Sequence, residues 1–350
     1  MKEINSYISL RGDNEINLNG NESYLGIEQE MLGMMKSSFG KVDFNRYPDN
    51  ENVKIKELYS IYIGEEITKD NIVVGNGSDE MLGLIISMVI GENKKLLTVS
   101  PDFTMYDYYV SIQNGKIIKY HSDRNGFVDI DKLIELGKKE NVDLVMFSNP
   151  NNPTGYAFSL DEVKRVVEAF PNIYVVIDEA YYEFYGESVV GEVNKYKNLI
   201  VTRTLSKAWG LAALRIGFLI SSEDNIKKFN ESKVPYSISS LSLAVAEVAL
   251  TNQTRVKEDS KKIVEEREKL YSKLKNIEKE AVLEVEFFKS KANYIFGRTP
   301  YKEALLTGLR MNCINIRSFE DDSFRITIGS PFENSRLLQS LRKIFVYGGE

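Results

Sequence analysis

Residues 199–220 read LIVTRTLSKAWGLAALRIGFLI, two apolar runs joined by a stretch that contains Lys207. The runs, Leu199–Thr202 and Ile216–Ile220, are continuous and do not alternate with polar residues, which predicts strands buried on both faces of a sheet. Lys207 follows the first strand and Arg215 precedes the second. A lysine in a cofactor pocket can form an imine and an arginine can clamp a phosphate, but either residue alone is usually a solvated surface charge.

The same pattern extends upstream to about residue 70, where short apolar runs alternate with helix-like stretches. Between two of these runs, Ser159–Ala169 is amphipathic, and Ser159 followed three residues later by Glu162 is typical of a helix N-cap. The alternation predicts an α/β fold with a mostly parallel sheet between helices. The upstream runs are Ile72–Val74, Leu96–Val99, Lys116–Tyr120, Val142–Ser148 and Ile173–Ile177.

The character of the sequence changes in its last third. Ser239–Ile277 is rich in Ala, Glu, Lys and Leu and lacks Pro and Gly, which predicts one or two long helices. We expect a large α/β domain at residues 40–245, a smaller α+β domain at 246–350, and an N-terminal arm at 1–39 that adds to the smaller domain. The smaller domain has a predicted helix at Tyr301–Arg310 and predicted strands at Val282–Phe288, Tyr294–Phe296, Ile314–Arg317 and Phe324–Ile328.

The composition argues against several classes of protein. The net charge of the 350 residues is −6, whereas a nucleic-acid-binding surface is basic, so we expect no nucleic-acid partner. The most apolar stretch, Met81–Ile90, is too short to span a membrane, and we expect no membrane association. The single histidine, His121, argues against a Ser–His–Asp triad and a multi-histidine metal site. With one cysteine and no apolar secretory segment at the start, we expect a cytoplasmic protein.

The segment Gly75–Glu80, GNGSDE, follows a predicted strand and opens an apolar helix. The N-terminus of a helix carries unpaired N–H groups and partial positive charge, and glycine lets the backbone approach an anion closely. The segment therefore suits a phosphate, although a glycine turn with Ser78 or Asp79 as the N-cap explains the same residues.

The segment Asn149–Gly155, NPNNPTG, directly follows the predicted strand Val142–Ser148. Ligands of open α/β sheets bind beyond the carboxyl ends of the strands. Two prolines restrict this loop, so that its asparagine side chains can be aimed at a ligand. A rigid turn with no ligand is an equally good interpretation.

The segment Asp178–Tyr181, DEAY, ends another predicted strand. An acid at the end of a buried strand is costly unless it is paired, either with a cationic pyridinium nitrogen or in a salt bridge. We expect Asp178, rather than Glu179, to be the buried acid because it follows the strand directly.

Together the four motifs supply a phosphate cradle, an asparagine, an acid with a tyrosine, and a lysine with an arginine, which is the set that pyridoxal 5′-phosphate (PLP) requires. In this order the segments GNGSDE, NPNNPTG, DEAY, TLSKAWGLAALR and FRITIG resemble the fold-type I PLP-dependent aminotransferases. Among these, the chain is most similar to the histidinol-phosphate aminotransferases, from roughly Asn17 to its C-terminus.

The resemblance implies a role for each cofactor residue. Lys207 is the Schiff-base lysine and proton shuttle, and Asp178 pairs with the pyridine N–H. Phe103 stacks on the ring, and Tyr47 reaches the phosphate site of a partner subunit, which implies a homodimer with shared sites. Tyr181 and Asn152 bond the phenolic oxygen O3′. The phosphate is surrounded by Gly77, Ser78, Asp79, Ser206 and Arg215.

The resemblance also implies substrate residues. Arg325 matches the arginine that grips the substrate α-carboxylate, and Arg317 matches a second arginine near the distal end of the substrate. The family has Asn-Glu-Asn-Pro-Tyr-Gly near its N-terminus, where the tyrosine approaches the substrate, but residues 21–26 here read NESYLG. Leu25 occupies the tyrosine position, and Tyr24 is the candidate to replace it.

The implied reaction converts histidinol phosphate and 2-oxoglutarate to imidazole acetol phosphate and glutamate in histidine biosynthesis (EC 2.6.1.9), with an amino donor and a 2-oxo acid as substrates. Three alternatives stay open. One is a decarboxylase of threonine or serine phosphate, since PLP stabilises the carbanion whichever bond is broken. Another is an aromatic amino-acid aminotransferase, and the most remote is a PLP-fold protein without catalysis.

Overall fold

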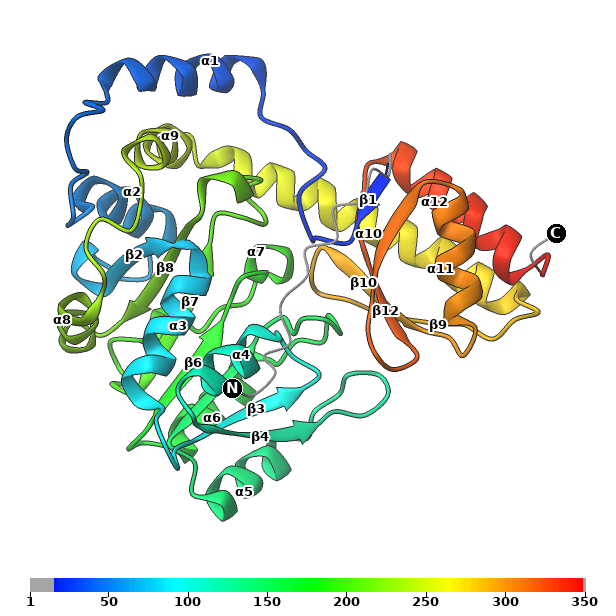
Figure 1. Ribbon diagram of the computed structural model, residues 1–350, viewed down its shortest axis with the longest axis horizontal. Helices are drawn as coiled ribbons and strands as arrows, with labels where there is room; N and C mark the ends of the chain where they lie inside the picture. The colour runs from blue at the N-terminus through cyan, green and yellow to red at the C-terminus, as the bar shows by residue number, and fades with distance from the viewer. Residues whose placement is uncertain (1–15, 349–350) are drawn as a thin grey trace.

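Two β-sheets with helices packed against them make up the fold (Figure 1). The computed structural model describes residues 16–348. The larger sheet has the strand order β2, β8, β7, β6, β5, β3, β4. Its strands are Ile72–Asn76 (β2), Lys95–Ser100 (β3), Lys116–His121 (β4), Leu144–Ser148 (β5), Tyr174–Asp178 (β6), Leu199–Thr204 (β7) and Ile216–Ser221 (β8).

Neighbouring strands of the larger sheet run parallel, except that β8 is antiparallel to both β2 and β7. The last residues of β2, β5, β6 and β7 and the first residue of β8 therefore meet at one edge, which we call the carboxyl edge. In the register of the sheet, Ser148 lies beside Asp178, and Asp178 lies beside Thr202. Each of the four sequence motifs lies at this edge, and the predicted mostly parallel α/β sheet is confirmed.

Helices cover both faces of the larger sheet because successive strand residues point to opposite sides. Along β5, Val145 and Phe147 join one apolar core, whereas Leu144 and Met146 join the other. The prediction of strands buried on both faces is confirmed for β5 to β8. It is wrong for β4, an edge strand with partly exposed side chains. The helices around this sheet are Val53–Ile63 (α2), Gly77–Val89 (α3), Met105–Ile112 (α4), Ile130–Glu140 (α5), Leu160–Ala169 (α6), Tyr182–Tyr185 (α7) and Glu223–Ser232 (α8).

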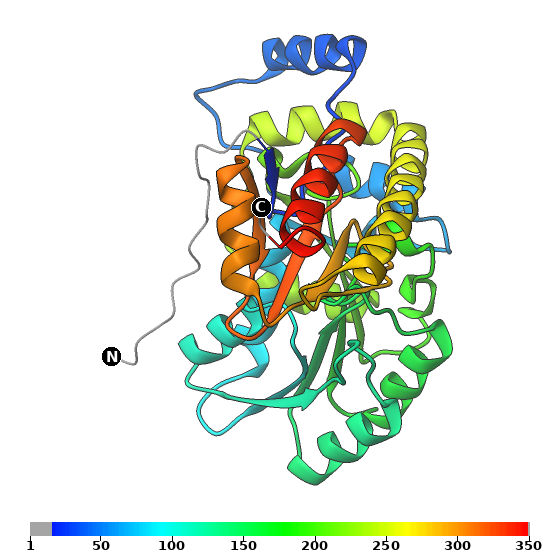
Figure 2. The same ribbon diagram turned by 90° about the vertical axis from the view of Figure 1, so that its right-hand side faces the viewer.

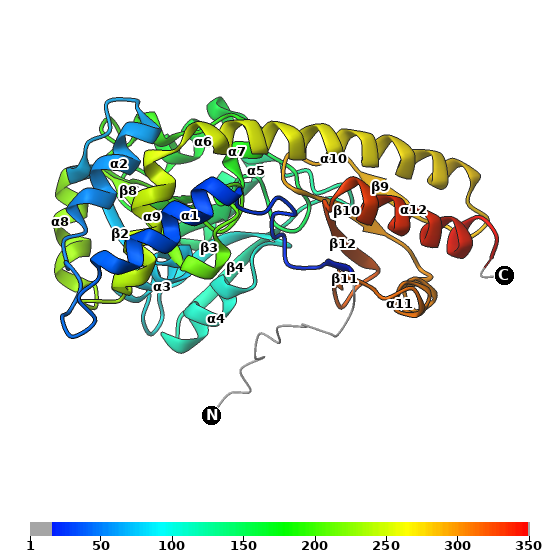
Figure 3. The same cartoon turned by 90° about the horizontal axis from the view of Figure 1, so that it is seen from above.

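The smaller sheet has the strand order β1, β11, β12, β10, β9 and is antiparallel except for the parallel pair β1 and β11. Its helices lie side by side in Figure 2, α11 in orange, α12 in red and α10 in yellow. Seen from above, α10 runs from the larger sheet to the smaller one (Figure 3). The elements are Ile16–Leu18 (β1), Thr254–Glu280 (α10), Glu286–Phe288 (β9), Tyr294–Arg298 (β10), Lys302–Met311 (α11), Ile314–Ser318 (β11), Ser323–Thr327 (β12) and Pro331–Phe345 (α12).

The N-terminal segment contributes to both parts of the molecule. Its strand β1 pairs with β11, and its helix α1 (Gln29–Ser38) packs on α9 (Ser240–Thr251) at the far side of the larger sheet (Figure 1). The strand β1 was not predicted, because three residues are too few to show a periodicity. Residues 1–15 of the predicted arm lie outside the described part of the chain.

Local signals explain where the remaining helices begin and end. The capping box predicted at Ser159 and Glu162 is confirmed. The long helical stretch forms two helices, α9 and α10, which separate where the Asn252 side chain bonds the Val248 carbonyl. Helix α12 was not predicted, although Ser330 also forms a capping box at its start. Among residues 16–348, no helix combines the length and apolarity needed to cross a membrane.

Candidate active site

A cavity of about 410 Å³ opens at the carboxyl edge of the larger sheet. It brings together residues that the sequence placed in four separate motifs, and the loop before α4 adds another side. The predicted residues that line it are Ser78, Asp79, Phe103, Asn152, Asp178, Tyr181, Ser206, Lys207 and Arg215. It is also lined by Met105, Tyr109, Ser148, Ala180 and Thr204.

The first turn of α3 and the Arg215 guanidinium form one end of the cavity. Helix α3 begins at Gly77, so the interpretation of Ser78 or Asp79 as its N-cap is wrong. Gly77 has φ +80°, and a Cβ there would lie 2.7 Å from Nη2 of Arg215. That same Nη2 lies 3.0 Å from Oδ2 of Asp79, and Nη1 donates to Ser206 Oγ at 3.4 Å. Helix N–H groups and a guanidinium at one point suit a phosphate.

Asp178, at the end of β6, is 4% exposed and lies at the floor of the cavity. The hydroxyls of Tyr106 and Thr202 each donate to its carboxylate at 3.0 Å. Burial raises the pKa of Asp178 to about 6, although these two hydrogen bonds lower it. Among the described residues Asp178 forms no salt bridge; that interaction belongs to Glu179, which is equally buried and pairs with Arg203 at 2.8 Å. The expectation that only one of the two acids is buried is therefore wrong.

Lys207 and Tyr181 lie together beside the N-terminal segment. The Lys207 ammonium donates to the Gly20 carbonyl at 3.0 Å and lies 5.8 Å from the centre of the Tyr181 ring. The Tyr181 hydroxyl accepts a hydrogen bond from the Asn21 side chain at 2.9 Å. Asn21 in turn is held by Thr327 of β12 through its backbone N–H. The smaller sheet thereby fixes one wall of the site.

Two arginines of the smaller sheet lie beside this wall. Arg325 on β12 is 8% exposed and donates to the Asn152 side-chain oxygen and, at 2.7 Å, to the Asn19 carbonyl. Arg317 on β11 is the register partner of Arg325, so both side chains leave the same face of the sheet. Asn152 therefore links the loop after β5 to Arg325.

Comparison with known proteins assigns the family. The model of the family described as aminotransferase class I and II matches residues 13–341. The chain belongs to this family. It is 38% identical to a histidinol-phosphate aminotransferase of Clostridium kluyveri, over 95% of this chain and 93% of that protein. It is 34% identical to a histidinol-phosphate aminotransferase of Clostridium novyi, over 98% and 95%.

The fold of a class I and II aminotransferase is also seen in solved structures. One is histidinol-phosphate aminotransferase from Sinorhizobium meliloti in complex with pyridoxal-5′-phosphate. It superposes with a TM-score of 0.85 at 24% identity, covering 95% of this chain and 92% of that chain. The predicted fold-type I architecture is thus confirmed.

The residues around the cavity fit PLP, the cofactor of this aminotransferase family. A phosphate fits the first turn of α3, because Gly77 leaves space that a Cβ would fill against Arg215. The Asp178 carboxylate can accept the pyridinium N–H, since its two protein donors leave it an acceptor. Lys207 presents a primary amine in the same cavity. The cavity thus supplies a partner for each polar end of the cofactor.

Replacing Gly77 by alanine is expected to weaken PLP binding about tenfold. The left-handed backbone costs a residue with a Cβ about 1–2 kcal/mol, and the new methyl group pushes Arg215 off the phosphate position. Titration of cofactor-free protein with PLP, followed by absorbance, measures this loss. Gly64→Ala is the matched control, because Gly64 has φ +67° in open space. Equal PLP affinities of the two variants would contradict the assignment of Gly77 to the phosphate site.

Asp178 gives a second prediction, for protein without cofactor. Its folded pKa of about 6 lies above the usual 3.8, so the native state binds the extra proton. Below pH 4 its full contribution to the free energy of unfolding is present. As the pH rises to about 6, the free energy of unfolding falls by about 3 kcal/mol. Asp178→Asn is therefore expected to gain stability over wild type between pH 4 and pH 6 and to keep that difference above pH 6. Denaturant unfolding at several pH values measures it, and a pH-independent difference would contradict the raised pKa.

Five predicted site residues are not among those that line the cavity: Gly77, Arg317, Arg325, Tyr24 and Tyr47. Tyr47 is 83% exposed and stacks on Tyr236 with ring centres 4.9 Å apart. Tyr24 is half-buried, and its pKa is raised by burial and by Glu266 and Asp259 of α10. The roles of both tyrosines at the cofactor and the substrate therefore stay predictions.

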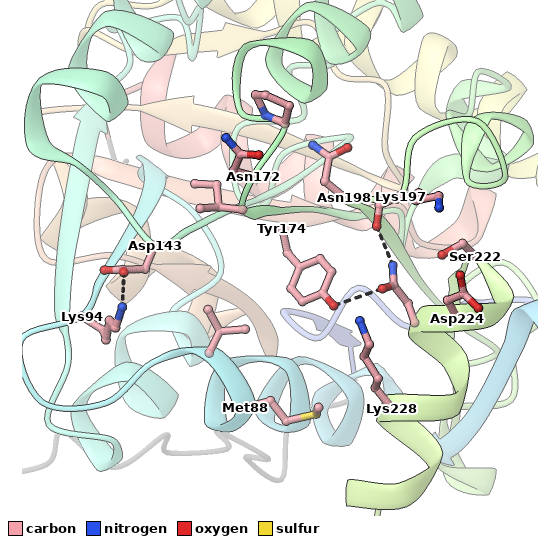
Figure 4. Close-up of a pocket in the computed structure, with 14 residues that line it drawn as sticks. Met88, Lys94, Asp143, Asn172, Tyr174, Lys197, Asn198, Ser222, Asp224 and Lys228 are labelled. Carbon is pink, nitrogen blue, oxygen red and sulfur yellow. Dashed lines mark hydrogen bonds and ion pairs between the residues drawn. The ribbon is translucent and has the colours of Figure 1, made fainter.

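A larger cavity, of about 650 Å³, lies at the opposite edge of the larger sheet (Figure 4). Several of its polar groups are already engaged with one another: Lys94 pairs with Asp143 at 2.6 Å, and the Tyr174 hydroxyl donates to Asn225 at 3.0 Å. The amino ends of parallel strands are also the edge where ligands of such sheets do not bind. The smaller cavity is therefore the candidate active site.

Proposed function

We propose that the chain transfers the amino group of histidinol phosphate to 2-oxoglutarate, giving imidazole acetol phosphate and glutamate (EC 2.6.1.9), in histidine biosynthesis. The observation that carries this proposal is the pair Arg317 and Arg325 on one face of the smaller sheet, next to Asn152. Curated relatives with the name histidinol-phosphate aminotransferase, at 34% and 38% identity, support the same assignment.

The chemistry of the two substrates explains why arginines suit this site. Histidinol phosphate carries a phosphate ester where glutamate carries its α-carboxylate. A guanidinium binds both groups through two parallel hydrogen bonds, which an ammonium cannot do. Arg325 would therefore hold the phosphate of one substrate and the carboxylate of the other. Arg317 and Tyr24 would bind the distal ends of the two substrates.

The residues of the chain divide the remaining work. When bound, PLP withdraws electrons from the Cα of the amino donor and so makes its proton acidic. Lys207 would move the proton at Cα, because among the described residues that line the cavity it is the one that carries an amine. Asp178 would hold the positive charge of the pyridinium, and Asn152 with Tyr181 would hold O3′. Phe103 would restrict the ring to one plane.

The proposal includes a homodimer with shared sites. Tyr47 lies in the segment that precedes α2, where Phe44 is also exposed, at 76%, and these rings would be covered by a second copy. Tyr47 would then complete the phosphate site of the partner. We further propose the domain division at residues 40–245 and 246–350, with 1–39 as the arm, and a cytoplasmic location, with which a lone cysteine is compatible.

A substrate panel tests the proposed reaction. The holoenzyme is given histidinol phosphate, phenylalanine, tyrosine, threonine phosphate or serine phosphate, each with and without 2-oxoglutarate. We expect the highest kcat/KM with histidinol phosphate, and glutamate formed in equal amount. Carbon dioxide release from threonine or serine phosphate without 2-oxoglutarate would identify a decarboxylase instead. A preference for phenylalanine or tyrosine would identify an aromatic aminotransferase, and no turnover of any donor a non-catalytic protein.

A further inference from the structure

Asp102, in the loop between β3 and α4, makes three hydrogen bonds around the candidate active site. Its carboxylate accepts from the backbone N–H of Phe103 at 2.8 Å and from the backbone N–H of Ser148 at 3.1 Å. The Ser148 hydroxyl donates to it as well. All three partners are donors, so each needs an acceptor oxygen, which the carboxyl group of Asp102 supplies.

The contacts continue from Ser148 to the substrate arginine. The Ser148 hydroxyl accepts from the backbone N–H of Asn152 at 2.9 Å. The Asn152 side-chain oxygen then accepts from Arg325. Phe103, Ser148 and Asn152 all line the candidate cavity, whereas Asp102 does not. Asp102 therefore bonds residues that line the site without lining it itself.

We propose that Asp102 is a positioning residue for the amino transfer, and that it fixes Phe103 and Asn152 relative to each other through its own carboxylate and the Ser148 hydroxyl. Phe103 is the predicted stacking residue for the ring, and Asn152 is the predicted partner of O3′. One carboxylate thus sets the distance between the stacking group and the oxygen-binding group. The inference depends on PLP chemistry at this site and not on histidinol phosphate.

The energetic cost of Asp102 supports this role. Burial raises the pKa of Asp102 to about 8, although the bonds from Ser148 and Phe103 lower it. An acid that is costly to bury, and whose partners all line a cavity, is more typical of functional sites than of structural loops. An apolar side chain would fill the same space without that cost but would leave the N–H groups of Phe103 and Ser148 without an acceptor.

The variant Asp102→Asn tests the proposal, because it keeps the shape and places an NH₂ group against one of the donors. For the holoenzyme without substrate, we expect the pH at which the PLP absorbance band changes to move by about one unit, since Asn152 no longer holds O3′. We expect kcat to fall about tenfold per PLP-loaded site, as for one hydrogen bond to a charged group. Ser148→Ala should cause similar changes, and the double variant should add little to either.

Two measurements separate positioning from folding. Asp107→Asn is the matched control, since Asp107 lies on α4 with a partly exposed side chain paired to Lys119. It should leave the absorbance transition and kcat unchanged. The proposal would be overturned if Asp102→Asn lowered only the Tm and kept the wild-type absorbance transition and the wild-type kcat per loaded site. It would also be overturned if the effects of Asp102→Asn and Ser148→Ala were strictly additive. Because the absorbance transition needs no amino donor, its result is independent of which substrate the enzyme takes.

Discussion

Lys207→Ala is expected to lower the rate of amino transfer by roughly 10⁴-fold, the upper end of what one positioned acid–base group contributes. Lys207 follows β7 in the chain and lines the cavity, and its amine lies 5.8 Å from the centre of the Tyr181 ring. Water at the vacated position is a weaker base and is not held in a fixed geometry. The rate of glutamate formation, normalised to bound PLP, measures the loss.

The control for Lys207 is a lysine at the other edge of the same sheet. Lys197 precedes β7 and lines the larger cavity of Figure 4, so Lys197→Ala should keep the wild-type rate. If Lys207→Ala kept the wild-type rate of glutamate formation, the role of Lys207 would be wrong. Rescue of Lys207→Ala by added small amines would support the loss of a base rather than a folding defect.

Asp178→Asn is expected to lower kcat by roughly 10- to 100-fold, which corresponds to one hydrogen bond to a charged group. An amide has the shape of the carboxylate but no charge to hold a pyridinium proton on the cofactor. Tyr106 and Thr202 donate to different oxygens of the carboxylate, so one hydroxyl can still donate to the amide oxygen while the other turns to accept from the amide NH₂, and the fold is kept. The variant should therefore be more stable than wild type above pH 6 without cofactor and yet slower with it. Steady-state kinetics at saturating PLP measure the loss.

The opposite signs of these two effects make the Asp178 prediction specific. A residue with only a structural role would lose stability and activity together. Thr202→Val removes one donor to Asp178 but keeps the charge, so its kcat should fall less than that of Asp178→Asn. A larger loss in Thr202→Val, or an unchanged kcat in Asp178→Asn, would contradict the assignment of Asp178 as the pyridinium partner.

The sequence alone predicted the larger sheet and most of the cavity lining, because both follow from short-range patterns. Apolar runs mark the buried strands, and the residues just after a parallel strand lie at the carboxyl edge by geometry. Ser78, Asp178 and Lys207 come together for this reason. The same logic fails for β1, which is only three residues long and is defined by its pairing with β11.

Residues that act through other residues were not predicted, because their partners are distant in the sequence. Tyr106 reaches Asp178 across 72 positions, and Asn21 reaches Tyr181 across 160. Thr202 gave a weak signal, as a polar residue at the end of an apolar run, and Ser148 gave a similar one at the end of β5. Such contacts depend on how strands and loops pack, which no local pattern encodes.

Covalent labelling tests the role of Lys207 most directly. Borohydride reduces a carbon–nitrogen double bond between a lysine and an aldehyde cofactor to a stable single bond, and peptide mass spectrometry then locates the modified lysine. We predict that the holoenzyme carries reduced PLP on the peptide that contains Lys207, and that Lys207→Ala carries none. PLP found on another lysine, or no covalent PLP in the wild-type protein, would contradict the assignment of Lys207 and with it the mechanism proposed for the cavity.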